Sequence, residues 1–324
     1  MKRLSVSTLL QAITGIMATV LVVTFAYSAE RAWERWADAQ KVLSVVSISR
    51  DLFQAMQNLR IERGTVNTAL TAPEPAGADT QSEVAALRAQ ADVALQSALA
   101  KLKVAGLADV AAGINELHSN RDAVAKLRQD ADAAILRPKT ERPAGLSKSW
   151  VAGMGKLVDG MDALADRLSA PIDRSDPLIA ELLMMKQLGW EARAAAGVDR
   201  LMVGAAIAAG DGIAADQQRQ LAVLQGRVEV AWKVIGEKVH EADAPPRLRA
   251  AFEAAQQSYF TELSEKRKAI VADLVSGQKP SVSGGDWVRL SNPGLAAIMD
   301  VANVSFELTE QAAARLADAA QRDF

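Results

Sequence analysis

The sequence predicts an all-α fold, with an N-terminal transmembrane helix followed by two related four-helix bundle modules. Three observations lead to this prediction. Apolar residues make up 50% of the chain but aromatic residues only 4%, which favours close packing of helices over a sheet rich in β-branched and aromatic side chains. Apolar positions recur three and four residues apart over long segments, and an uncharged stretch lies near the N-terminus.

The transmembrane helix is predicted from the uncharged stretch Leu4–Ala29. Its apolar part, Leu9–Tyr27, matches the length of about 20 residues that a helix needs to cross the hydrocarbon core of a bilayer. We therefore expect residues 9–29 to span the cytoplasmic (inner) membrane in a single pass.

The orientation of this helix follows from the charges on its flank. Lys2 and Arg3 precede it, and positively charged flanks stay in the cytoplasm. Residues 1–8 are then a cytoplasmic N-terminus, and the bulk of the chain lies in the periplasm. A cleaved signal peptide, with Ala26-Tyr27-Ser28 as its small-residue site, is the alternative. Both interpretations export the rest of the chain.

Turn-forming clusters divide the exported part into segments of roughly 25–45 residues with helical periodicity, a length typical of helical bundles. Two segments begin with capping signals, Thr80 before Glu83 and Ser175/Asp176 before Pro177. The turn-forming clusters are 71–79, 137–145, 170–177, 209–213, 244–246 and 276–286.

An internal duplication is indicated by one repeated offset. Glu62-Arg63 is echoed by Asp199-Arg200, and Trp150 by Trp287. The differences 200 − 63 and 287 − 150 both equal 137. Because tryptophans and turn clusters obey the offset as well as the apolar periodicity, we interpret it as a true repeat. We expect both tryptophans to have a packing role.

The duplication places a first helical bundle module at residues 30–170 and a second at residues 171–324. Each contains four predicted helices. Whether the two modules stack as consecutive bundles or share long helices is left open by the pattern.

Arginines interrupt the apolar seam of the first long helix in each module. Spacings of four and three place Arg63 in the first seam and both Arg193 and Arg200 in the second, with Arg60 at the edge of the first. The apolar members of the two seams are Leu52, Met56, Leu59, Val66 and Leu70 in the first, and Gly189, Ala196, Val203 and Ile207 in the second.

A guanidinium group inside a bundle needs an anionic partner, because burying an isolated charge costs several kcal/mol. In one interpretation each seam arginine meets an internal carboxylate. In the other, the arginines converge on a small external anion, with Thr65 and Asn67 as additional donors. The internal carboxylates available for the first interpretation are Glu62, Asp122, Asp162 and Glu191.

Catalysis, metal binding and nucleic-acid binding receive no support from the sequence. There is no cysteine, and the only two histidines, His118 and His240, are far apart. No nucleophile motif, phosphate loop or metal-ligand spacing occurs, so we expect neither an enzyme nor a cofactor or metal site. The net charge of −2 argues against nucleic acid as a partner.

These residues resemble a known family of sensor domains. The resemblance is to the nitrate- and nitrite-sensing (NIT-type) all-helical domain of methyl-accepting chemotaxis proteins, sensor kinases and some antiterminators. The chain is also similar to the helical bimodular sensor domain of chemoreceptors, which binds small organic acids. The residues that carry the resemblance are Leu59, Glu62, Arg63 and Gly64 on the first long helix, and Arg193, Ala196, Gly197 and Arg200 on its counterpart.

The resemblance implies a function in signal transduction. The chain would be the extracytoplasmic sensory domain of a bacterial transmembrane receptor, a homodimer that binds a small anion such as nitrate or nitrite. The alternatives are a small carboxylate sensor of the bimodular type, and a membrane-tethered structural or protein-interaction bundle without a small ligand. The implied ligand-binding residues are Arg63 first, then Arg60, Arg193 and Arg200, and then Thr65 and Asn67.

One departure from these families concerns the output of the signal. Their receptors continue into a second membrane helix and a cytoplasmic signalling module, whereas no second apolar run occurs before Phe324. We therefore expect a separate cytoplasmic signalling partner or a missing C-terminal module.

Overall fold

The structure, a computed structural model, describes residues 6–105, 110–170, 176–210 and 212–322. Every regular element in these ranges is a helix, which confirms the all-α class for this part of the chain. The elements are α1 (Val6–Thr71), α2 (Ala78–Ala105), α3 (Ala111–Ile135), η2 (Lys139–Glu141), α4 (Leu146–Ser169), α5 (Pro177–Ala209), α6 (Ala215–Val239), α7 (Pro246–Ala255), the π-helix η4 (Gln256–Leu263), α8 (Ser264–Val275) and α9 (Gly284–Arg322).

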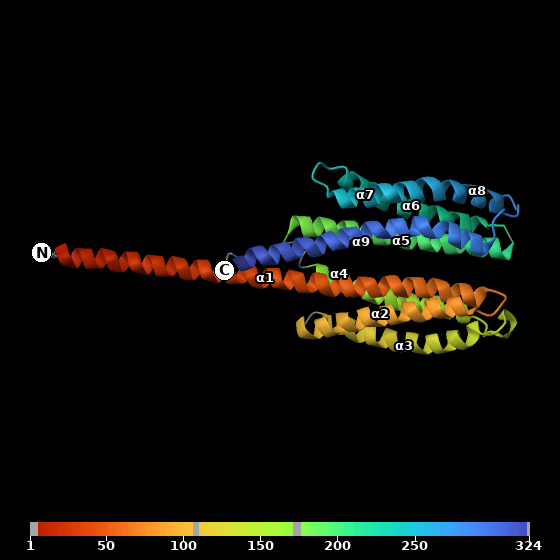
Figure 1. Ribbon diagram of the computed structural model, residues 1–324, viewed down its shortest axis with the longest axis horizontal. Coiled ribbons are helices and arrows are strands. Elements are labelled where there is room, and N and C mark those ends of the chain that lie inside the picture. Colours follow the sequence, from red (N-terminus) through yellow and green to blue (C-terminus); the bar gives the residue numbers. More distant parts are fainter. Residues whose placement is uncertain (1–5, 106–109, 171–175, 211, 323–324) are drawn as a thin grey trace. The chain divides into compact units, whose positions relative to one another are not determined.

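The first helix, α1, continues for 66 residues from the apolar N-terminal stretch into the folded part of the chain. Leu10, Val20 and Phe25 are exposed along the stretch. Among the described residues, α1 is the one helix long and apolar enough to cross a membrane. Figure 1 shows its red N-terminal part extending past the ends of α2, α3 and α4.

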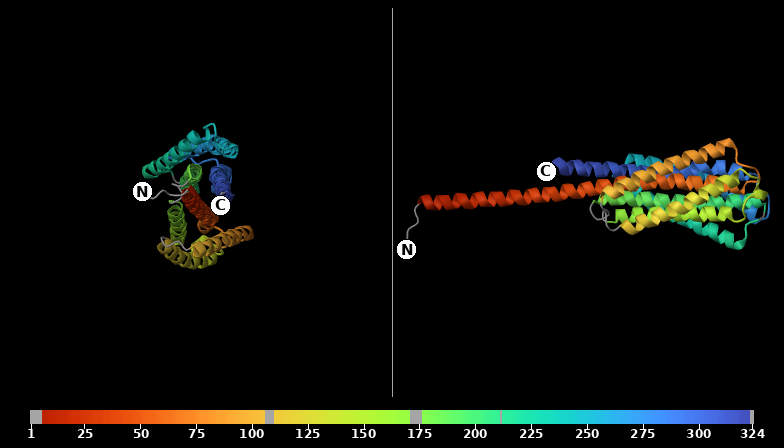
Figure 2. Two further views of the ribbon diagram at one scale, coloured as in Figure 1. Left: turned by 90° about the vertical axis from the view of Figure 1, so that its left-hand side faces the viewer. Right: turned by 90° about the horizontal axis from the view of Figure 1, so that it is seen from below.

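The chain divides into two compact units. Unit 1 consists of Met1–Ser175 together with Ala313–Phe324, and unit 2 consists of Asp176–Ala312. In unit 1, α1 packs against α2 and α4, and α3 packs against α4. The three views in Figures 1 and 2 show these four helices running side by side along most of their shared length.

The core of unit 1 lies between the α1 seam and α4. The predicted apolar positions of this seam are all buried, and Arg63 is partly buried among them. Opposite, α4 contributes Trp150, Met154 and Met161, which have no exposed surface. The seam prediction for α1 is therefore confirmed, including the unusual charge inside it.

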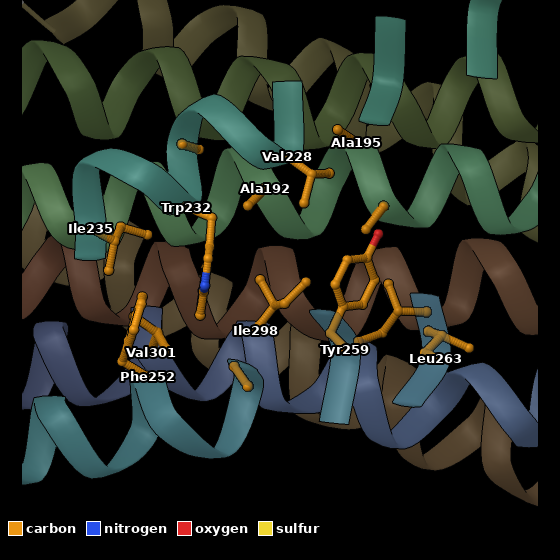
Figure 3. Packing of buried hydrophobic residues seen from close by; sticks show 14 of the residues in the cluster. Ala192, Ala195, Val228, Trp232, Ile235, Phe252, Tyr259, Leu263, Ile298 and Val301 are labelled. Atoms are coloured by element: carbon orange, nitrogen blue, oxygen red, sulfur yellow. The ribbon is translucent and has the colours of Figure 1, made fainter. Parts of the chain in front are cut away.

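Unit 2 is built from α5, α6, the run α7–η4–α8, and the part of α9 that ends at Ala312. Figure 3 shows its core, in which Ala192 of α5, Trp232 of α6, Phe252 of α7 and Ile298 of α9 surround a common interior. The Trp232 ring stacks on Phe252 at a centroid distance of 4.6 Å and on Phe260 at 4.5 Å. Aromatic packing of this kind adds to the burial of the aliphatic seam.

The π-helix η4 was not anticipated from the sequence. Each turn of a π-helix accommodates extra residues inside an otherwise α-helical run, and such turns are rare. Here α9 approaches the π-helix closely, because a Cβ atom on Gly294 would lie 3.2 Å from the Tyr259 Cα atom and 3.3 Å from the Ser258 carbonyl oxygen. Gly294 therefore permits a contact that a larger residue would prevent.

The two predicted helix starts have different outcomes. Asp176 caps α5, since its carboxylate accepts a hydrogen bond from the Ile179 backbone N–H at 3.0 Å, and Pro177 follows in the first turn. Ser175 lies outside the described residues. Thr80 is not a cap. The backbone bond from Gln81 N–H to the Gly77 carbonyl already begins α2, so Thr80 lies within its first turn.

Candidate functional site

Two tryptophans donate hydrogen bonds to the backbone carbonyl groups of the seam arginines Arg63 and Arg200. The Trp150 indole Nε1–H of α4 donates to the Arg63 carbonyl oxygen of α1 at 3.0 Å. The Trp287 indole of α9 donates to the Arg200 carbonyl oxygen of α5 at 2.9 Å. Both rings are buried, and a buried indole requires an acceptor. The same hydrogen bond therefore occurs in both units, 137 residues apart.

The Arg63 guanidinium group of unit 1 has little electrostatic compensation. Burial lowers the pKa of Arg63, and the negative charge of Asp159 on α4 opposes this effect only in part. Among the described residues, no hydrogen bond or ion pair joins its guanidinium nitrogens to another side chain. A Cβ atom on Gly155 would lie 3.8 Å from Nη1, which places the group beside a residue without a side chain.

Arg200 lies in the corresponding position of unit 2. Burial lowers the pKa of Arg200 as well. Its Nη1 donates to Asn292 Oδ1 of α9 at 2.8 Å, while its Nε is buried without a hydrogen-bond partner. Asn292 follows Gly155 by 137 residues, so the two arginines face equivalent positions occupied by different residues.

The acidic residue before each arginine is buried but is not its partner. Glu62 is fully buried and accepts hydrogen bonds from Arg88 of α2 at 2.6 Å and from Arg128 of α3 at 2.7 Å. Successive residues of an α-helix point about 100° apart, so Glu62 faces α2 and α3 while Arg63 faces α4. The pairing of Arg63 with Glu62, which the first interpretation allows, therefore does not occur.

The network around Glu62 extends to the edge of unit 1. Arg88 also forms a bidentate pair with Asp132 of α3, with distances of 2.7 and 2.8 Å. Arg128 also contacts Asp92 of α2 at 3.3 Å. Because every charge has a partner of opposite sign, the network is a structural element that ties α1, α2 and α3 together.

Unit 2 contains a smaller version of this network. Asp199 of α5 accepts two hydrogen bonds from Arg267 of α8. Burial alone would lower the pKa of Arg267, but the hydrogen bonds and charge of Asp199 raise it. Tyr259 lies close enough that burial, followed by the charge of Asp199, raises the pKa of its hydroxyl.

The other predicted ligand residues are distributed over both units. Arg60 and Asn67 lie on the same side of α1 as Arg63, at spacings of three and four, and Asn67 Oδ1 accepts a hydrogen bond from the Ser147 hydroxyl at 2.6 Å. Thr65 is partly buried but lies two positions after Arg63, on another side of the helix.

Arg193 belongs to a different neighbourhood from Arg200. Its Nη1 lies 2.8 Å from where a Cβ atom on Gly197 would be, and its charge acts on Tyr259. Arg193 thus lies near the Asp199–Arg267 pair, two helical turns before Arg200. Of the predicted residues, the structure brings together Arg60, Arg63 and Asn67 on α1.

Several residues of the site were not identified from the sequence. The paired arginines Arg88, Arg128 and Arg267 carry no local signal, because their role depends on how α2, α3 and α8 turn toward the first helix of each unit. Gly155 and Asn292 do carry a signal. The 137-residue offset aligns them directly and could have drawn attention to the difference between them.

Comparisons with known proteins identify the fold. No family model matches the sequence, and no curated protein sequence matches it. The structure is similar to that of the NasR transcription antiterminator, with a TM-score of 0.65 and 18% sequence identity, over 92% of this chain and 75% of that chain. At this identity the likeness shows a shared helical fold.

Proposed function

We propose that this chain is the extracytoplasmic sensory region of a membrane-anchored bacterial receptor of the NIT type, and that it binds a small anion such as nitrate or nitrite. In this proposal the two units are related four-helix modules that arose by duplication. The helix at residues 9–29 anchors the chain in the cytoplasmic membrane, and the bulk of the chain lies in the periplasm.

The observation that carries the proposal is the pair of seam arginines. Arg63 and Arg200 occupy equivalent places, burial lowers the pKa of both, and neither forms an ion pair with a carboxylate among the described residues. A buried guanidinium without an anionic partner is unfavourable by several kcal/mol. A bound planar oxyanion would supply the missing charge and accept two parallel N–H bonds.

Two further observations support the assignment to a sensor. The motif around Arg63 resembles that of NIT-type domains, which also occur in some antiterminators, and the fold is similar to that of a transcription antiterminator. The apolar part of α1 supports a membrane anchor by its length and composition. These observations favour a small-anion sensor over a helical bundle that only binds other proteins.

Signalling in this proposal requires a homodimer and a cytoplasmic signalling partner or module. Anion binding favours one of two packings of the bundle, and α1 carries the displacement toward the membrane. A ligand can shift this equilibrium only by the difference in its affinity for the two packings.

The proposal is tested by titration calorimetry of the 324-residue chain in detergent with nitrate, nitrite and C2–C4 carboxylates. We expect one class of small anion to bind and Arg63→Gln to weaken binding by at least about tenfold, because it removes a charge-assisted hydrogen bond. Arg227→Gln is the matched control, since Arg227 is exposed and paired with Glu191. Binding should also stabilise the fold, by about 2.7 kcal/mol at an anion concentration of 100 times Kd.

The outcomes separate the alternatives. Preference for a carboxylate over nitrate and nitrite would assign the chain to the bimodular type of sensor. If no anion binds and Arg63→Gln leaves stability unchanged, the sensor proposal is wrong and a membrane-tethered interaction bundle becomes the better description.

Membrane topology can be tested separately, because the chain contains no cysteine. A single Ser281→Cys substitution lies at an exposed position of unit 2. In intact cells with a permeable outer membrane, a membrane-impermeant maleimide should label this cysteine. Labelling only after lysis would contradict the periplasmic placement.

A further inference from the structure

The helical turns directly after the apolar stretch of α1 carry a cluster of aromatic and basic side chains. Tyr27 and Trp33 are each 53% exposed, and Trp36 is partly exposed. The Trp33 and Trp36 rings lie together, with a centroid distance of 5.1 Å and an interplanar angle of 42°. Arg31 and Arg35 are exposed in the same turns. We call these five residues the collar.

Both arginines of the collar reach back toward the N-terminus. The Arg31 guanidinium carbon Cζ lies 4.6 Å from the centroid of the Tyr27 ring, one helical turn earlier. Arg35 Nε donates a hydrogen bond to the Arg31 carbonyl oxygen, again one turn earlier, at 3.3 Å. Side chains of an α-helix tilt toward its N-terminus. Tyr27, Arg31 and Arg35 therefore form a row directed toward the apolar stretch.

The collar has the composition and the height of a membrane interface. At 1.5 Å per residue, Arg31 lies about 6 Å and Trp33 about 9 Å beyond Tyr27 along the helix axis. The headgroup layer on each side of a bilayer is about 5–8 Å thick, and the backward tilt brings both side chains into it. Indole rings collect at this level, and an arginine stem can lie along apolar surface while its guanidinium group meets lipid phosphates.

We propose that the collar binds phospholipid headgroups of the periplasmic leaflet, with its two tryptophans in the interfacial layer and its two arginines at the lipid phosphates. This inference rests on the membrane anchor of the proposed function and names the partner of the turns that follow the anchor. Continuity supports a lipid partner, because the collar directly extends the exposed apolar surface that runs from Ile13 to Tyr27.

The charge of the segment specifies the kind of lipid. Glu30, Glu34 and Asp38 are exposed beside the two arginines, so residues 27–38 carry three negative and two positive charges, a net charge of −1. Anionic lipid therefore gains no overall attraction to the segment. We expect zwitterionic phosphatidylcholine, which carries the same phosphate group, to be sufficient.

The test measures tryptophan fluorescence of the 324-residue chain in phosphatidylcholine vesicles. These vesicles carry a nitroxide quencher either on the headgroup or near the end of the acyl chain, and a second set also contains phosphatidylglycerol. The matched control is Trp33→Phe/Trp36→Phe, which keeps two aromatic rings and removes their indole emission. The other four tryptophans are buried in the two units and form the background: Trp150, Trp190, Trp232 and Trp287.

We expect the headgroup quencher to remove the emission of two of the six tryptophans, a loss of about one third, and the acyl-chain quencher to remove much less. The Phe variant should not show this loss, and phosphatidylglycerol should not change it. Arg31→Glu/Arg35→Glu should reduce the loss, because carboxylates repel lipid phosphates. Circular dichroism of each variant establishes that the fold is retained.

The failure of this inference differs from the failure of the proposed function. A chain that does not float with the vesicles in a density gradient lacks the anchor, and both fail. If the chain floats but the collar tryptophans are quenched by aqueous acrylamide and not by the headgroup quencher, the collar lies in water and the inference alone is overturned.

Three further outcomes also overturn the inference alone. Protection of the collar tryptophans from both lipid and aqueous quenchers indicates a contact with protein, for which a second copy of the chain is the candidate. Headgroup quenching that needs phosphatidylglycerol contradicts the lipid class. Headgroup quenching that is unchanged in Arg31→Glu/Arg35→Glu contradicts the contact between the arginines and the phosphates.

Discussion

The two units bury an acidic residue at the same point and neutralise it differently. Glu62 of unit 1 is held by two arginines from two helices, and these in turn hold further aspartates. Within the described part of the chain, Asp199 of unit 2 is held by Arg267 alone. The longer glutamate reaches between α2 and α3, while the shorter aspartate meets a single arginine on α8.

Hydrophobic packing differs in the opposite sense. Unit 2, which has the smaller ion pair, contains the stacked rings of Trp232, Phe252 and Phe260 in its core. The offset of 137 places Leu95 of unit 1 at the position equivalent to Trp232. The comparison shows that both units repeat a buried carboxylate next to an arginine. Ionic contacts complete the interior of unit 1, and aromatic packing completes that of unit 2.

The largest expected effect comes from removing the carboxylate of unit 1. Glu62→Ala leaves Arg88 and Arg128 buried without their shared partner and should reduce the free energy of unfolding by about 3–5 kcal/mol. Asp199→Ala strands only Arg267 and should cost less. Urea unfolding of both variants measures the difference, and an equal loss in the two units would contradict the ionic contrast between them.

The second prediction concerns a feature that the units share. Trp150→Phe and Trp287→Phe each remove one indole hydrogen bond and part of a fully buried ring, so each should cost about 2 kcal/mol. Because the geometry is the same in both units, thermal and urea unfolding should give similar losses. A loss confined to one unit would show that the repeated hydrogen bond matters in only one of them.

Two helical glycines should respond in opposite directions to the same substitution. A Cβ atom on Gly189 would lie 3.2 Å from the Ala302 backbone nitrogen, so Gly189→Ala should destabilise unit 2 by about 1–3 kcal/mol. Gly155 has room, and Gly155→Ala should stabilise its helix by about 0.5–1 kcal/mol. Urea unfolding of the two variants tests the sign, and destabilisation by both would refute the open space beside Arg63.

The smallest effect on the free energy of unfolding at neutral pH is expected from Tyr259→Phe. By the offset of 137, the equivalent position in unit 1 is Asp122. Burial raises the pKa of Tyr259 above the usual value of about 10. The folded state therefore keeps a proton that the unfolded state releases, and this stability is complete below pH 10 and lost as the pH rises above it. Unfolding free energies measured at pH 9, 10 and 11 should fall less steeply for the variant.

Much of the fold could be predicted from the sequence, because periodicity and turn residues act locally. The buried seam around Arg63 and the cap at Asp176 follow from spacing alone. The π-helix at Gln256–Leu263 could not be predicted, because apolar spacing alone does not show where a helix takes extra residues into one turn. Its presence is consistent with the spacing of Arg128 and Arg267, which differ by two residues from the common offset.

The candidate site was predictable only in part. Spacing identified Arg63 and Arg200 as charges inside apolar seams, and the structure places both among buried residues. Spacing could not show that Arg193 and Arg200 lie among different neighbours. It also could not show that Glu62 turns away from Arg63, because the partner of a side chain depends on the rotation of helices distant in sequence.

The unbroken length of α1 has a mechanical consequence. Residues 28–62 include neither glycine nor proline, so the segment between the apolar stretch and Arg63 has no obvious hinge. At 1.5 Å per residue, Arg63 and Tyr27 lie about 54 Å apart along one continuous helix. A small translation or rotation of α1 at Arg63 is therefore not absorbed by a flexible joint. It reaches Tyr27 as the same translation or rotation.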